Sequence, residues 1–113
     1  MKRTAVNPWP WSLQFGFNQA ELIEGHTREL VCAGQTAMDA DGNPQHLDDM
    51  RAQIALALDN VEAVLAEGGM SLANVVRFNM YTTDVDEFFA NYDVITDRTA
   101  AAGITPPGTL LVP

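Results

Sequence analysis

Residues 29–44 read ELVCAGQTAMDADGNP, and three local patterns follow one another within them. Residues 30–32 form a short apolar run, which is typical of a buried strand. Gly34 and Gln35 come soon after, and a glycine in a strand pattern often marks a bulge or a close approach of ligand or backbone. Residues 39–44 combine Asp, Gly, Asn and Pro, which favour a turn. We therefore expect any functional site to lie next to Gly34.

Two strands precede this stretch in the prediction, and a long helix follows it. Residues 4–7 can form a short edge strand, and residues 18–23 form a second strand that a tight turn joins to residues 28–32 as a hairpin. Residues 47–67 change to a helical period, because apolar side chains recur there at steps of three and four. Two glycines at 68–69 end this helix.

The C-terminal part of the chain is predicted to add a strand, a helix and a last strand. Residues 75–82 alternate between two faces, as a half-buried strand does. Thr83 or Asp84 can cap a second helix, with Glu87 three positions after Asp84 as in a capping box, and Gly103 closes this helix. Residues 109–112 follow two prolines and form the last strand.

These elements predict a single α+β domain over residues 1–113, in the order β-β-α-β-α-β. The start is antiparallel, and the later crossovers are right-handed. One mixed sheet with two helices on a single face leaves its other face uncovered. An apolar uncovered face needs a partner, so the layering alone leads us to expect an oligomer.

Composition excludes several classes of protein. The formal net charge is −9, from six Lys and Arg against fifteen Asp and Glu, so we expect no nucleic-acid partner. No apolar run approaches the roughly 20 residues of a membrane helix, so we expect no membrane partner. Cys32 is the only cysteine, which fits a reducing, cytoplasmic location. Its apolar neighbours predict that Cys32 is a small buried hydrophobe.

Familiar catalytic and metal-binding motifs do not occur in the sequence. Residues 39–43 are similar to a calcium loop, but the glycine stands fourth and Met50 occupies the twelfth position, so a turn is the better interpretation. His26 and His46 have no Cys or carboxylate at a recognised ligand spacing. The sequence therefore predicts no metal site.

Six features in order give the chain a resemblance to the RidA/YjgF family, from about Leu13 to Val112. They are residues 15–17, 30–35, 41–43, 57–65, 75–84 and the prolines 106–107. The resemblance implies a chorismate-mutase-like fold that closes as a homotrimer with a barrel-like core and clefts between subunits. It also implies hydrolysis of imines and enamines to 2-keto acids and ammonia, without a cofactor. It further implies one more strand beyond Pro113.

The resemblance places a substrate site in the cleft, although the chain departs from the family pattern there. The matching positions are Phe17, Ala33, Gly34, Gln35, Asn91 and Thr109. Thr109 stands where deaminating members have a carboxylate-binding arginine, and without a charge it cannot clamp a carboxylate in that way. Turnover by this chain would direct the search to other clamps such as Arg28 or Arg77. Phe17 lacks the tyrosine hydroxyl, and Ala33 replaces a small hydroxylated residue. Gln35 and Thr109 are the candidates for catalysis.

Three functions follow from these residues. The first is a cofactor-free imine or enamine hydrolase of altered specificity, for which an uncharged substrate is one option. The second is a trimer that binds a small metabolite, such as an imine or a 2-keto acid, without turnover. The third, a ribonuclease or translation inhibitor, fits worst because of the negative charge.

Overall fold

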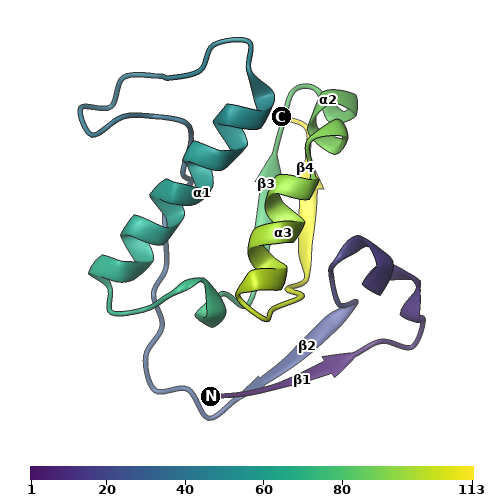
Figure 1. Ribbon diagram of the computed structural model, residues 1–113. Helices are drawn as coiled ribbons and strands as arrows, with labels where there is room; N and C mark the ends of the chain where they lie inside the picture. Colours follow the sequence, from purple (N-terminus) through teal and green to yellow (C-terminus); the bar gives the residue numbers. More distant parts are fainter.

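The computed structural model describes residues 1–113 as an N-terminal hairpin beside a larger α/β part (Figure 1). This confirms the α+β class. The strands and α-helices, in chain order, are β1 (Lys2–Val6), β2 (Ala20–Glu24), α1 (Met50–Glu67), β3 (Phe78–Tyr81), α2 (Val85–Ala90), α3 (Asp93–Ala101) and β4 (Gly108–Leu111). Two 3-10 turns, η1 (Pro10–Phe15) and η2 (Leu72–Asn74), complete the chain. No helix combines the length and the apolar character that a membrane span requires.

Helix α1 confirms the predicted helix, three residues shorter at its start. Asp49 caps it, since its side chain accepts a hydrogen bond of 3.0 Å from the Ala52 backbone N–H. His46 and Asp48 have positive φ values of 62° and 60°, so the chain turns sharply just before the cap. The helix buries Leu58 and other apolar residues of the predicted stripe against the rest of the core.

The second predicted helix is wrong as a single element, because it breaks into α2 and α3 at Asn91. Asp84 caps α2 as expected, accepting a 3.1 Å hydrogen bond from the Glu87 backbone N–H. The Asn91 side chain then donates 2.9 Å to the Glu87 carbonyl. Such local bonding by asparagine competes with the helix ladder, and the chain restarts as α3 after Tyr92.

Strands β3 and β4 form a parallel pair with Phe78 opposite Gly108 and Asn79 opposite Thr109. Alternation places Phe78, Met80 and Leu110 on the inner face, where they pack against core residues of α1, α2 and α3. Figure 1 shows α3 lying directly across this pair, with α1 alongside. The predicted arrangement of helices on one face is therefore confirmed for β3–β4. The opposite face is open in the single chain.

The predicted single mixed sheet is wrong for the isolated chain, which has two separate two-stranded sheets. Strand β2 pairs with β1, antiparallel, and not with residues 28–32. Residues 26–35 make no backbone–backbone hydrogen bond at all. Val31 is 85% exposed, and Cys32 is exposed where a buried side chain was predicted. A strand exists only by pairing, and the single chain offers this segment no neighbour.

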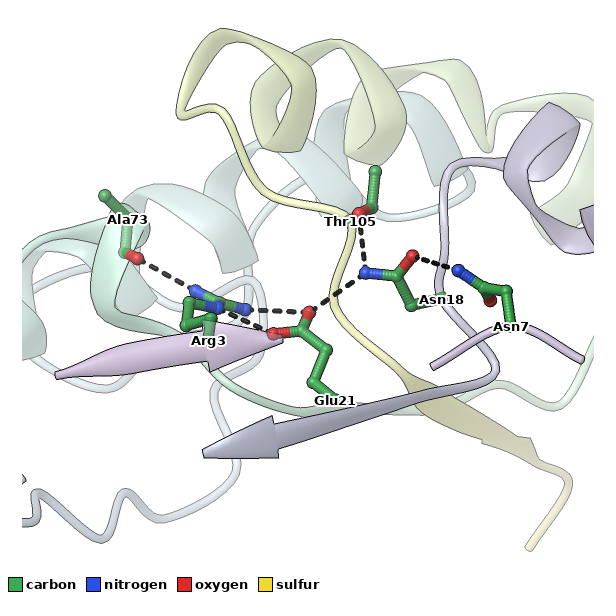
Figure 2. Close-up of polar contacts among 6 residues, drawn as sticks. All are labelled: Arg3, Asn7, Asn18, Glu21, Ala73 and Thr105. Carbon is green, nitrogen blue, oxygen red and sulfur yellow. Dashed lines mark hydrogen bonds and ion pairs between the residues drawn. The ribbon is translucent and has the colours of Figure 1, made fainter. Parts of the chain in front are cut away.

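A buried polar cluster joins the hairpin to the α/β part (Figure 2). Arg3 binds both carboxylate oxygens of Glu21, at 2.6 and 3.0 Å, and donates 3.0 Å to the Ala73 carbonyl. Asn18 donates to Glu21 at 3.4 Å and to the Thr105 hydroxyl at 2.9 Å. Only 4% of the Glu21 side chain is exposed. The hairpin is therefore attached through Arg3 and Asn18, and the Glu21 carboxylate holds both side chains in place.

Replacing that carboxylate tests its structural importance. We expect Glu21→Gln to lower the free energy of unfolding by about 2–4 kcal/mol, because it leaves the Arg3 charge partly buried and unpaired. The matched control is Arg51→Gln, which breaks the Arg51–Asp93 pair, whose side chains are 55% and 52% exposed. That loss should stay below about 1 kcal/mol. Urea unfolding of both variants measures the difference, and equal losses would contradict the prediction.

Candidate functional site

The open face of β3–β4 carries three polar side chains in contact. The Arg77 guanidinium donates 2.8 Å from Nη2 to the Thr109 hydroxyl and 3.1 Å from Nε to the Asn79 side-chain oxygen. Arg77 lies just before β3, while Asn79 and Thr109 are directly opposite each other in the register. All three residues are exposed. The open face of the sheet thus holds the Arg77 guanidinium in a fixed orientation beside Thr109, which carries no charge itself.

The other arginines of the folded parts are neutralised by carboxylates. Arg3 binds Glu21, Arg51 binds Asp93, and Arg98 binds both Asp59 and Glu62. The Arg51 guanidinium lowers the pKa of the Asp93 carboxyl, and that carboxylate raises the pKa of Arg51. Arg77, in contrast, bonds only to neutral groups. No continuous basic stripe results from this arrangement.

The small-residue motif lies apart from Thr109 in the single chain. Ala33 and Gly34 are exposed on the unpaired segment, and the Gln35 side chain reaches only the Ala33 carbonyl, at 3.4 Å. Farther along, Asn60 on α1 donates to the Thr36 and Met38 carbonyls at 2.9 and 3.0 Å. Helix α1 therefore holds the chain at Thr36 and Met38, while Ala33 and Gly34 face solvent.

Phe17 lines an apolar pocket of about 210 Å³ between η1, β3–β4 and the two C-terminal helices. Gly108, next to Thr109, lines the same pocket, and so does Tyr92, whose pKa is raised by burial of its ring. Phe17 also packs edge-on against Trp11, with ring centroids 6.1 Å apart. Phe17 therefore approaches β4 from the inner side of the sheet, and the Thr109 side chain lies on the outer side.

Asn91 is occupied at the C-terminal end of α2, since its side chain donates to the carbonyl and the carboxylate of Glu87 at 2.9 and 3.3 Å. The single chain therefore does not gather the six predicted site residues. Sequence reasoning gave Arg77 no definite part and missed Asn79. The signal was their alternation with Phe78 in a strand, which puts them on the Thr109 face once β3 and β4 pair. No group of three or more His, Cys, Asp or Glu residues could hold a metal ion.

Comparison with known proteins decides the family. The sequence model described as Endoribonuclease L-PSP matches residues 15–113. The chain belongs to the Rid, or YjgF, family. The mitochondrial protein mmf2 of Schizosaccharomyces pombe is 31% identical over 117 residues, covering 94% of this chain and 87% of mmf2.

Solved structures of the Rid family share the fold. YyfB of Yersinia pestis is 32% identical, with a TM-score of 0.78 over 99% of this chain and 85% of YyfB. TdcF of E. coli with bound serine is 22% identical, with a TM-score of 0.63 over 72% of this chain and 64% of TdcF, and its likeness concerns the fold alone. The sequence-based resemblance to the Rid family is thus confirmed.

Gly108 fixes the approach of the strand that carries Thr109. A Cβ at this position would lie 1.8 Å from the Phe78 carbonyl oxygen, so β4 could not keep its place beside β3. We expect Gly108→Ala to cost about 1–3 kcal/mol of unfolding free energy, measured in urea. Thr109→Ala, one residue away on the exposed face, is the control and should cost less than about 0.5 kcal/mol. An unchanged Gly108→Ala stability would refute the packing constraint.

Proposed function

We propose that the chain assembles as a homotrimer with a chorismate-mutase-like barrel core and clefts between subunits. The exposed surface supports assembly. The single chain exposes 7383 Å², whereas a folded monomer of 12.3 kDa is expected to expose about 6,100 Å². The excess of about 1,300 Å² approaches what two standard interfaces, at roughly 800 Å² each, cover on one subunit. Each subunit of a trimer has two neighbours.

The position of the uncovered groups also supports this assembly. Residues 26–35 expose apolar side chains and make no backbone–backbone hydrogen bond, the features of a strand edge that another chain can cover. The outer face of β3–β4 is open as well, with Tyr81 65% and Leu111 41% exposed. Contact between such surfaces of neighbouring subunits would bring Gln35 and Thr109 toward one cleft.

The activity we propose for this cleft is hydrolysis of small imines and enamines. Water adds its oxygen to the imine carbon while the nitrogen takes up a proton, and the C–N bond then breaks to release ammonia and a keto group. An enamine first takes up a proton on carbon and releases one from nitrogen to become the imine. The protein must orient the water and hold the substrate, which needs no redox step.

The predicted residues have distinct parts in this proposal. The Gln35 amide can both donate and accept, so it suits the orientation of water, while Ala33 and Gly34 leave room for the substrate. Phe17 lines the pocket on the inner side of the sheet and Asn91 bonds to Glu87, so we give neither a direct part in the chemistry. Thr109 contacts the substrate on the strand. The observation that carries the proposal is membership of the Rid family over residues 15–113.

A binding trimer without turnover is the second candidate. It is favoured by the departures at Phe17, Ala33 and Thr109, which remove a phenol, a hydroxyl and a guanidinium that deaminating members are expected to use. A ribonuclease remains the weakest candidate despite the name of the family model. RNA binding needs a basic surface, and three of the six Lys and Arg side chains are paired with carboxylates.

Assembly can be tested at Val31, whose side chain is 85% exposed in the single chain. We expect Val31→Asp to shift the trimer toward monomers, because a buried unpaired carboxylate at an interface costs several kcal/mol. Ala100→Asp adds the same charge to the exposed side of α3 and is the control. Light scattering after gel filtration measures both masses. A Val31→Asp protein that keeps the wild-type mass would contradict the proposed interface.

Catalysis can be tested by ammonia release from 2-imino acids that an amino-acid oxidase generates in place. We expect turnover above the buffer rate, and a loss of about tenfold or more in kcat for Gln35→Ala. Gln45→Ala is the control, since Gln45 bonds to Asp39 and Asn43 within the turn. Turnover that Gln35→Ala leaves intact removes Gln35 from the mechanism. A trimer without any turnover favours the binding role.

A further inference from the structure

The Arg77 guanidinium is held by one edge and free at the other. A guanidinium carries five N–H groups, one on Nε and two on each Nη. Arg77 uses the Nε hydrogen for Asn79 and one Nη2 hydrogen for Thr109, at 3.1 and 2.8 Å. Both Nη1 hydrogens and one Nη2 hydrogen have no partner in the structure. This terminal edge is the fork that binds a carboxylate through two parallel hydrogen bonds.

The charge around Arg77 distinguishes it from the other arginines. Arg3, Arg51 and Arg98 have each met a carboxylate, which neutralises them. Arg28 and Lys2 make no side-chain hydrogen bond in the structure, so nothing orients their charges. Arg77 alone is both oriented and uncompensated. In a chain of net charge −9, such a cation is a specific place for a small anion.

We propose that Arg77 binds the carboxylate of the substrate at the Thr109 position, with Thr109 as a second contact to the ligand and Asn79 as a positioning residue. This inference rests on the proposed function, because it names the group that holds the substrate of that hydrolase. Thr109 accepts a hydrogen bond from Arg77, which leaves its own hydroxyl hydrogen free to donate to the ligand. A single guanidinium with neutral neighbours suits a monoanion, so the ligand class is small monocarboxylates.

The position on the sheet explains how a threonine can serve where related sequences are expected to have an arginine. Arg77 reaches Thr109 across the strand pair from the β3 side, at a sequence separation of 32 residues. The guanidinium thus comes from a residue just before the neighbouring strand β3 and lies beside Thr109 on the open face. Thr109 is small enough to leave this space to the guanidinium and polar enough to orient it.

Direct binding of pyruvate tests the inference, with pyruvamide as the neutral counterpart. In the unaltered protein, we expect pyruvate to shift the NMR signal of the Arg77 Nε–H group and pyruvamide to leave it in place. By calorimetry, Arg77→Gln should weaken pyruvate binding roughly ten- to a hundredfold, the range of a charge-assisted pair. Arg77→Lys should lose less. Thr109→Val, which removes the hydroxyl acceptor, should weaken binding roughly two- to tenfold.

Arg51→Gln is the matched control, because it removes the same charge from the helical side of the molecule. Absence of pyruvate binding to the unaltered protein, or equal binding to Arg77→Gln, overturns the inference. Ammonia release separates this result from the fate of the proposed function. Pyruvate binding through Arg77 without turnover keeps the inference and rejects the hydrolase. Turnover that is equal in the unaltered protein and Arg77→Gln keeps the hydrolase and rejects the inference.

Discussion

Arg3 and Asn18, both bonded to the buried Glu21 carboxylate, join the hairpin to the α/β part of this molecule. Strands β1 and β2 pair only with each other, so no sheet continues from the hairpin into the α/β part. Arg3, Asn18 and the carbonyl of Ala73 instead meet at or beside that carboxylate. One backbone hydrogen bond of 2.9 Å, from Asn18 to the Thr105 carbonyl, runs in parallel. Hydrogen bonds of this kind fix the orientation of the hairpin relative to the α/β part, because they are directional. They bury little apolar surface.

The α/β part is held differently, by apolar packing and by ion pairs between helices. Phe78, Met80 and Leu110 fill the inner face of β3–β4 against the helices. Arg98 on α3 reaches across to Asp59 and Glu62 on α1 and ties the two helices together. This packing occupies the inner face apart from the apolar pocket that Phe17 lines. The core therefore makes no demand on the outer face, which can carry polar groups. Arg77 and Thr109 lie on this face.

Local pattern was enough to predict the elements whose stability is mostly local. The period of residues 47–67 gave α1, and the alternation around Phe78 gave β3, because each pattern records the burial of one face. The break at Asn91 was missed because the competing bond from its side chain to Glu87 leaves no trace in the apolar period. Residues 30–32 have a strand composition, but composition cannot supply a neighbouring strand, and the isolated chain provides none.

The site was harder to predict than the fold because its contacts join residues that are distant in the sequence. The family resemblance directed attention to Thr109, and the structure shows that Arg77, from just before the other strand, bonds to its hydroxyl. Pairing of β3 with β4 in one register brings the two together, and a shift by one residue would turn Arg77 toward the core. Gly108 enforces that register by allowing β4 to touch the Phe78 carbonyl. The packing of one glycine thus positions a charge on the opposite face, so fold and site cannot be separated at this strand pair.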